Sequence, residues 1–155
     1  MDDRKKKATL KNYETAGDKR EVIQPEVAGM SVLDVGCLGT DSITGLHDQI
    51  RQWANSTIGI DVNEQLAKKV HDVRVADAQK FTLESPVDTV VAGDLIEHLP
   101  NPGQFIERSE VNLKQGGRLV IATPNAMGYR HFQNRFFMRE TVNRNHTCWF
   151  DPVTL

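Results

Sequence analysis

The feature that most constrains the fold is a series of short apolar runs, rich in β-branched residues, that recur at regular intervals along the chain. Each run is nearly continuous in its apolar residues, which is typical of strands buried on both faces of a parallel sheet. The runs occupy residues 31–35, 56–60, 73–76, 87–92 and 118–123. Helical patterns lie between them, so the chain alternates strand with helix.

The intervening segments carry apolar residues at helical spacing and polar residues suited to helix ends. The predicted helices cover residues 42–54, 63–71 and 102–113. Asn63 and Asn101 stand where N-caps are expected, and Gln-Gly-Gly at 115–117 is expected to end the last helix. Strands that alternate with helices are joined by right-handed crossovers. The sequence therefore predicts an α/β fold: a doubly wound, Rossmann-like, mainly parallel sheet with helices on both faces.

Length and composition are those of a single globular domain. The chain has 155 residues, 39% hydrophobic and 26% charged, so we expect one domain over 1–155, with residues 1–10 disordered. The formal charge of −2 gives no general attraction to nucleic acid or to an anionic membrane. No apolar run approaches the ~20 residues that span a bilayer, and no secretory segment begins the chain. The two cysteines, Cys37 and Cys148, form no metal-type pair, which favours a reduced, cytoplasmic setting.

Acidic residues and glycines follow the ends of successive predicted strands. Ligands of open parallel sheets bind beyond the carboxyl ends of the strands, so these residues are candidates for a binding site. They are Asp34, Gly36 and Gly39 at the first strand, Asp61 at the second and Asp77 at the third. Gly36 permits a tight turn and close approach of the backbone to a ligand. Asp61 is placed to accept hydrogen bonds from both hydroxyls of a ribose, and Asp77 from an exocyclic amine of a purine.

The loop after the first strand differs from the G-x-G-x-x-G sequence of dinucleotide-binding proteins. Leu38 and Thr40 stand at the alternate positions where glycines are expected. An acid directly before the turn, Asp34, would also repel a pyrophosphate. These residues favour a ligand that combines an adenosine with a cationic end. A nicotinamide-dependent oxidoreductase of Rossmann type is the alternative.

Five segments together resemble the class I S-adenosylmethionine-dependent methyltransferases, of the type 11 and type 23 kind. They occur in order between about residue 30 and residue 155: VLDVGC, IGIDVN, VRVADA, VVAGDLIEHLPNP and GGRLVIATPN. The resemblance implies S-adenosyl-L-methionine as the cofactor. It also implies the following binding residues: Asp34 and Gly36 beside the methionine part, Gly39 in the same loop, Asp61 on the ribose, Val62 against the adenine, Asp77 and the Ala78 amide at the adenine edge, and Gly93 and Asp94 closing the pocket.

This sequence departs from that class in length. Such enzymes normally continue with a helix and an antiparallel strand pair after this point. With the usual strand order 3-2-1-4-5, the fifth strand would lie at an open edge, and open edges invite pairing. We therefore expect a sheet without the final strand pair, and either a homodimer formed through that edge or poor solubility. A further alternative is a catalytically inactive methyltransferase fold that binds a partner.

The chemistry beyond the cofactor centres on the segment after the fourth predicted strand. If this segment enters a helix, Asp94, Glu97 and His98 lie on one side of its first turn, and His146 is the candidate to join them. These four side chains suit Mg²⁺ or Mn²⁺, which would lower the pKa of a hydroxyl acceptor. The arrangement is similar to that of the small-RNA 3′-terminal 2′-O-methyltransferases and the quinone-precursor O-methyltransferases. The alternatives are a metal-free site in which His146 accepts the proton, or Glu97 and His98 as helix caps or pocket-lining residues.

The segment 126–146 combines phenylalanines with four arginines, and is either a lid over the acceptor or a solvated helix face. A lid of this charge favours an anionic acceptor. The predicted function is S-adenosylmethionine-dependent O-methylation of a small-molecule, saccharide, quinone-type or RNA-terminal hydroxyl, with nucleic acid the less favoured acceptor. The catalytic candidates are Glu97, His98 and His146. His47 and His71 lie in helical patterns and are expected at the surface.

Overall fold

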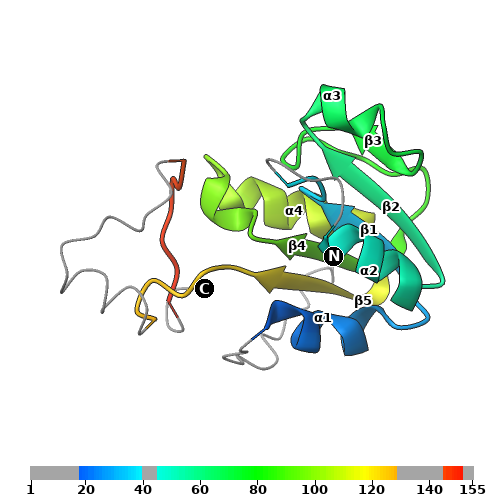
Figure 1. Ribbon diagram of the computed structural model, residues 1–155, viewed down its shortest axis with the longest axis horizontal. Coiled ribbons are helices and arrows are strands. Elements are labelled where there is room, and N and C mark those ends of the chain that lie inside the picture. The colour runs from blue at the N-terminus through cyan, green and yellow to red at the C-terminus, as the bar shows by residue number, and fades with distance from the viewer. Residues whose placement is uncertain (1–17, 40–44, 129–144, 152–155) are drawn as a thin grey trace, which may run out of the picture.

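Five parallel strands form the central sheet. The computed structural model describes residues 18–39, 45–128 and 145–151. The strands are β1 (Ser31–Val35), β2 (Ser56–Asp61), β3 (Val73–Val75), β4 (Val87–Gly93) and β5 (Leu113–Ala122). They lie in the order β3-β2-β1-β4-β5, and each neighbouring pair is parallel (Figure 1). The predicted doubly wound α/β fold and its strand order are confirmed.

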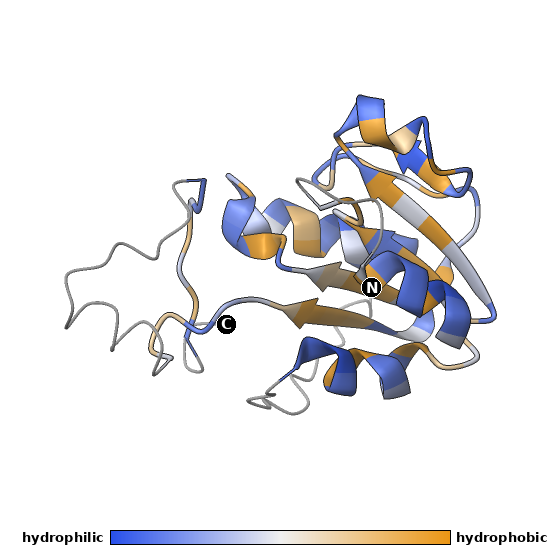
Figure 2. Ribbon diagram, in the orientation of Figure 1, coloured by the Kyte–Doolittle hydropathy of each residue, from blue (hydrophilic) through white to orange (hydrophobic). Residues whose placement is uncertain are grey.

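Helices cover both faces of this sheet. They are α1 (Lys19–Val27), α2 (Leu46–Trp53), α3 (Glu64–Ala67), the 3-10 turn η1 (Ile96–His98) and α4 (Pro102–Asn112). Figure 1 shows α1 and α4 on opposite sides of β4 and β5. Because side chains alternate along a strand, Val32 packs with α1 and α2, whereas Leu33 packs with Phe105 of α4. Figure 2 shows hydrophobic residues along the strands and mainly hydrophilic residues, with some hydrophobic ones, in the helices.

Two predicted helix starts are confirmed, and the helices are shorter than predicted. The side chain of Asn63 accepts a hydrogen bond from the N–H of Leu66 in α3 at 3.1 Å. Asn101 caps α4 in the same way by accepting from Gln104 N at 3.1 Å. Helix α2 begins at Leu46, with residues 42–44 outside the described part of the chain. Helix α3 ends at Ala67, after which a tighter turn, with Val70 N donating to Ala67 O at 3.1 Å, replaces further helix.

The expectation that the glycines at 115–117 end a helix is wrong. Strand β5 begins directly after α4, and the glycines lie within it. The register of β5 against β4 shifts between Val87 and Thr89, so residues 114–117 form a bulge, and Gly116 adopts a φ of +80°. The glycines serve this bulge. Nothing in the local pattern distinguishes that role from a helix stop.

Helix α1 has no counterpart among the predicted helices. Asp18 caps it by accepting a hydrogen bond from Arg20 N at 3.0 Å, and Ile23 and Val27 are fully buried one turn apart. Pro25 lies inside the helix, where it removes a backbone donor and weakens the sequence pattern. The burial of its inner face against β4 and β5 therefore stabilises α1 more than its own propensity does.

Several expectations extend beyond the described residues. The disorder expected for 1–10 and most of the lid expected at 126–146 lie outside them, as does part of the single domain expected over 1–155. Within the described ranges, β5 pairs with β4 alone, so the sheet ends there without the further strand pair. Among those same residues, no helix is both long enough and apolar enough to cross a membrane.

Candidate cofactor and acceptor site

Gly36 turns the chain sharply at the carboxyl end of β1. Its φ is +70°, a backbone conformation that favours glycine, and its N–H donates to Ile60 O of β2 at 2.8 Å. A Cβ at this position would lie only 2.8 Å from Leu95 Cδ1. The turn therefore favours a glycine on both conformational and steric grounds, and it lies at the carboxyl ends of the strands, where ligands of this fold class bind.

Asp61, at the carboxyl end of β2, connects that strand to the loop. Its Oδ2 accepts a hydrogen bond from Leu38 N at 3.0 Å and its Oδ1 accepts one from Asn63 N at 2.8 Å, with only 8% of the residue exposed. Each carboxylate oxygen retains further acceptor capacity. The next side chain, Val62, is 71% exposed although it is apolar. The Asp61 carboxylate, which can accept hydrogen bonds from hydroxyl groups, therefore lies next in the chain to the exposed apolar side chain of Val62.

Leu38 replaces a glycine for a reason that the structure makes clear. Its side chain is buried with Ala67, Val70 and Val73, so it joins the loop to the α3 side of the sheet. Thr40, the other replacement, lies outside the described residues, and Gly39 is exposed at the end of the described part of the loop.

Asp77 and Ala78 follow β3 and lie beside the end of β2, because Ala76 N donates to Asp61 O at 2.9 Å. The Asp77 carboxylate accepts a hydrogen bond from Gln79 N at 2.9 Å. This hydrogen bond and the nearby Lys80 hold the pKa of Asp77 below its usual range. Asp77 is thus an acceptor over the whole physiological pH range. Ala78 is buried.

Gly93 and Asp94 lie at the carboxyl end of β4, beside the other strand-end residues of the candidate site. A Cβ on Gly93 would lie 2.8 Å from Leu46 Cδ2, so the strand end fits closely against α2. Asp94 has a φ of +56°, its N–H donates to Ala122 O at 2.7 Å, and its carboxylate forms an ion pair with Lys19 of α1. Lys19 is not among the predicted site residues, because it lies in α1, a helix for which no prediction was made.

The expectation that His47 lies at the surface is wrong, whereas that for His71 is confirmed. His47 is only 1% exposed, and its Nδ1 lies 2.9 Å from Oδ2 of Asp34, which is itself 2% exposed. The His71 side chain is 77% exposed. Both histidines fit a helical pattern, but only His47 faces a buried carboxylate on β1. The spacing of residues along one helix does not predict which strand residue it will contact.

A second group of side chains gathers after β4. One ligand atom each from Glu97, His98 and His146 can be chosen so that all lie within 4.8 Å of one another. The rings of His98 and His146 meet edge to face with centroids 4.7 Å apart. Of the four residues predicted to hold a metal, the structure brings these three together. Asp94 stands apart with Lys19, because the chain turns at Asp94 instead of entering a regular helix there.

The Glu97 carboxylate is buried and half satisfied. Only 2% of the residue is exposed; Oε2 accepts a hydrogen bond from Thr123 Oγ1 at 2.9 Å, whereas Oε1 has no hydrogen-bond partner among the described residues. The His98 Nδ1 lies 3.2 Å from Asn145 O, and a carbonyl can only accept, so Nδ1 carries the proton. Nε2 of the neutral His98 ring is then the nitrogen with a lone pair.

Residues 145–151 carry His146 to this group from far along the chain. Thr147 N donates to Glu97 O at 2.8 Å, and Thr147 Oγ1 donates to Leu99 O at 2.7 Å. The segment lies beyond the carboxyl ends of β4 and β5, where Phe150 forms a bridge with Asn125 (Figure 1). The backbone and the side chain of Thr147 therefore both fix its position, through acceptors that lie about 50 residues away in the sequence.

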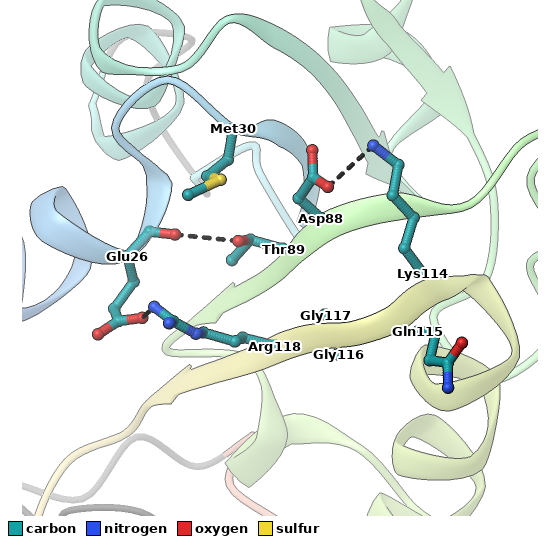
Figure 3. Close-up of a pocket in the computed structure, with 9 residues that line it drawn as sticks. All are labelled: Glu26, Met30, Asp88, Thr89, Lys114, Gln115, Gly116, Gly117 and Arg118. Atoms are coloured by element: carbon teal, nitrogen blue, oxygen red, sulfur yellow. Dashed lines mark hydrogen bonds and ion pairs between the residues drawn. The ribbon is translucent and has the colours of Figure 1, made fainter.

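A pocket also occurs at the opposite, amino end of β4 and β5 (Figure 3). Its four charged side chains pair with one another: Lys114 with Asp88 at 2.8 Å, and Arg118 with Glu26. Paired charges hold β5 against β4 and α1, so we assign this pocket a structural role.

The fold, the glycine turn and the row of strand-end carboxylates define a class of protein, the Rossmann-like methyltransferases that use S-adenosylmethionine. The chain belongs to the methyltransferase domain family, whose model matches residues 8–155. The predicted membership of the S-adenosylmethionine-dependent methyltransferases is confirmed, which implies S-adenosylmethionine as the cofactor. The nicotinamide-dependent alternative is not favoured.

Curated relatives are similar over much of this chain. The ubiquinone biosynthesis O-methyltransferase of Xanthomonas euvesicatoria pv. vesicatoria is 33% identical over 115 residues, covering 64% of this chain and 45% of the relative. The protein of the same name from Pseudomonas aeruginosa strain PAO1 is 32% identical over 111 residues, covering 64% and 46%. The chain therefore spans about half the length of the curated relatives it matches.

Solved structures share the fold. A SAM-dependent methyltransferase of Thermotoga maritima superposes with a TM-score of 0.67 at 13% identity, covering 86% of this chain and 63% of the other. The sugar N-methyltransferase KedS8 of Streptoalloteichus superposes with a TM-score of 0.55 at 23% identity, covering 71% and 47%. At these identities the likeness concerns the fold alone.

Proposed function

We propose that this chain transfers the methyl group of S-adenosylmethionine to a hydroxyl oxygen of a small-molecule acceptor, with a divalent metal ion at Glu97, His98 and His146. The observation that carries the proposal is the buried Glu97 carboxylate. Its Oε1 has no hydrogen-bond partner among the described residues, and one of its oxygens lies within 4.8 Å of a ring nitrogen of each of two imidazoles. The relatives named O-methyltransferase support oxygen as the acceptor atom.

The residues at the strand ends fit S-adenosylmethionine. An apolar side chain as exposed as Val62, directly after the buried Asp61, suits an adenine ring whose ribose hydroxyls donate to the carboxylate. Asp77 and the Ala78 amide would meet the adenine edge, and the loop from Asp34 through Gly36 and Gly39 would line the methionine part, with Gly93 and Asp94 closing it. When bound, the cofactor supplies an electrophilic methyl group on a positively charged sulfur.

The second group fits a divalent ion. A buried carboxylate oxygen without a partner is costly, and a cation would satisfy it. One carboxylate and two imidazoles leave open coordination positions, and the two nitrogen donors favour Mn²⁺ over Mg²⁺. When bound, such an ion lowers the pKa of a hydroxyl group that it coordinates. The role of this chain is to hold the acceptor oxygen beside Glu97, His98 and His146 and in line with the cofactor.

The test combines metal binding with methyl transfer. We would titrate Mn²⁺ into the protein, following free Mn²⁺ by electron paramagnetic resonance, and measure labelled methyl transfer to the catechol probe 3,4-dihydroxybenzoate. Glu97→Gln is expected to weaken Mn²⁺ binding and methyl transfer by about a hundredfold. Glu107→Gln, on the exposed face of α4, is the matched control and should change neither.

The possible outcomes separate the alternatives. Methyl transfer that survives both chelation and Glu97→Gln would overturn the metal site and favour His146 as a proton acceptor without metal. Unaltered Mn²⁺ binding in Glu97→Gln would overturn the assignment of the ligands. A protein that binds Mn²⁺ but methylates no hydroxyl acceptor would contradict the proposed reaction.

Two further parts of the proposal concern partners and location. Among the described residues β5 pairs on one side only, which supports a homodimer through its other side. Sedimentation of the protein would test this directly, and a monomer at high concentration would exclude it. The four arginines of 129–146, all of which lie outside the described residues, support an anionic acceptor. A cytoplasmic location rests on the two free cysteines, Cys37 and Cys148.

A further inference from the structure

The most telling group outside both proposed sites is the buried histidine of α2. His47 lies in the first turn of that helix, and its Nδ1 meets Asp34 Oδ2 at 2.9 Å, with both residues almost completely buried. The two residues stand 13 positions apart, on either side of the loop that follows β1. Their hydrogen bond therefore closes the base of the loop that begins at Gly36.

The other side of the same ring faces a second carboxylate. His47 Nε2 lies 3.6 Å from Asp72 Oδ2, which is longer than a hydrogen bond, and has no other partner among the described residues. Asp72 also pairs with Arg51 Nε at 3.0 Å, and its carbonyl accepts a hydrogen bond from Gly59 N at 2.9 Å. One imidazole thus connects β1 with the turn that precedes β3. A backbone hydrogen bond holds this turn beside β2.

Gly59 makes room for this ring. A Cβ at that position would lie 2.8 Å from His47 Cε1 and 2.6 Å from Cys37 Sγ. Both are closer than side chains normally approach, so a larger residue would displace the imidazole. Gly59 lies two residues before Asp61, the proposed ribose acceptor, and pairs with Asp34 in the β1–β2 register. The ring therefore packs directly behind the two strand ends that carry the proposed cofactor residues.

We infer that His47 is a positioning residue for the cofactor: by bridging Asp34 and Asp72 it sets the spacing between the glycine turn after β1 and the carboxylate of Asp61 after β2. This inference rests on the proposed use of that edge for S-adenosylmethionine. The bridge also accounts for a loop that functions with Leu38 in place of a glycine, because the loop is anchored at its base as well as through Leu38 N. His47 acts through Asp34, the cofactor-loop residue that it contacts, and is therefore a positioning residue and not a cofactor ligand.

The charges around the ring determine its dependence on pH. Burial disfavours a charge on His47, but the hydrogen bond and charge of Asp34, together with Asp72, outweigh burial and raise its pKa above the ordinary value. The other groups that face this region are Arg51 of α2, the thiol of Cys37, and His71, whose Nδ1 lies 3.9 Å from Asp72 Oδ1. Burial keeps the Cys37 thiol neutral by raising its pKa.

The sign of the effect follows from the raised pKa. Below that pKa the folded protein retains a protonated ring between two carboxylates, and this interaction is lost as the pH rises through it. The inference assigns the protonated, bridging ring to the form that binds the cofactor, so cofactor affinity should fall with rising pH in the native protein. A side chain that cannot take up the proton should remove that dependence.

The experiment compares His47→Asn with the native protein and with His71→Asn, the matched exposed control, by calorimetric titration with S-adenosylhomocysteine. The titrations run from about pH 6 to about pH 9, the range in which histidines titrate. His47→Asn is expected to bind S-adenosylhomocysteine about tenfold more weakly than the native protein at low pH, a typical coupling between a site and a residue outside it. Its affinity should also change less with pH than the affinity of the native protein does. His71→Asn should follow the native protein.

The outcomes separate this inference from the proposed function. If the native protein does not bind S-adenosylhomocysteine, the proposed function fails. If it binds, and His47→Asn binds equally with the same pH profile, the inference alone is overturned. Should His47→Asn fail to fold, the native protein still decides the matter through the ¹⁵N resonances of the His47 ring: an unchanged His47 pKa on addition of S-adenosylhomocysteine would overturn the inference, and a raised one would support it.

Discussion

Substitution of Gly36 by alanine tests the geometry of the cofactor turn, because the chain supplies a matched control. Gly36 and Gly29 have nearly equal φ values, +70° and +71°, but a Cβ at Gly29 has nothing within 4 Å, whereas one at Gly36 would lie 2.8 Å from Leu95 Cδ1. Gly29 precedes β1, at the opposite end of that strand from the proposed site. The two alanine variants thus share the backbone strain and differ in crowding and position.

The magnitude follows from these two contributions. A left-handed alanine costs about 1–2 kcal/mol, offset by about 0.4–1 kcal/mol because alanine restricts the unfolded chain. Gly29→Ala should therefore lower the free energy of unfolding by about 1 kcal/mol. Gly36→Ala adds overpacking, for which about 1–3 kcal/mol is typical, and the half-buried Leu95 can yield, so we expect about 1 kcal/mol more than for Gly29→Ala.

The assays are urea unfolding and calorimetric titration with S-adenosylhomocysteine. Gly36→Ala should weaken binding at least about tenfold, because a methyl group and a shifted Leu95 alter the backbone nearest the ligand, while Gly29→Ala should leave binding unchanged. Equal losses of both stability and affinity in the two variants would refute the reasoning. So would a Gly36→Ala protein that binds as the native one does.

Two further predictions concern stability. Phe105→Ala, which removes a fully buried ring between α4 and the sheet, should lower the free energy of unfolding by about 3–5 kcal/mol, whereas Ile106→Ala, at a site 45% exposed, should change it by less than about 1 kcal/mol; similar urea midpoints for the two would contradict the assigned core. Asp88→Asn should destabilise the protein at neutral pH, because Lys114 and Ser31 lower the pKa of Asp88 and the resulting stability is present above the ordinary carboxyl pKa and lost as the pH falls. The gap between native and Asp88→Asn unfolding free energies should therefore narrow in acid, and a gap independent of pH would contradict the Lys114 pair.

The sheet could be predicted because strands that are buried on both faces consist of nearly continuous runs of apolar, β-branched residues. The β-branched run at 31–35, the cap at Asn63 and the acid at Asp61 each follow from a local rule, and each stands where that rule places it. Fold class and the position of the binding edge therefore needed only local patterns and the topology of parallel strands.

The features that the sequence analysis missed depend on partners far along the chain. His47 fits a helix surface as well as a core, and only the approach of β1 and the space above Gly59 decide that it is buried. The glycines at 115–117 are a bulge because β4 lies beside them. His146 reaches Glu97 because the backbone and the hydroxyl of Thr147 donate to Glu97 O and Leu99 O, and the sequence around Thr147 does not identify these distant acceptors.

Leu38, which stands where a glycine is expected, is another residue whose role depends on partners distant in the sequence. In sequence it stands where dinucleotide-binding loops have a glycine. In the structure its side chain is buried beside α3, and its N–H donates to Asp61. The substitution is therefore compatible with an intact loop, because the backbone contact that the loop requires is still made.

The claim on which this account rests is that the edge bearing Asp61 and Val62 holds an adenosine. The most direct measurement is calorimetric titration of S-adenosylhomocysteine into the native protein, Asp61→Ala and Asp61→Asn, each checked for a native unfolding midpoint. We expect binding by the native protein, a loss of at least about tenfold in Asp61→Ala, and an intermediate affinity in Asp61→Asn, which keeps one acceptor oxygen. Equal affinity in all three proteins, or no binding by the native protein, would contradict the claim.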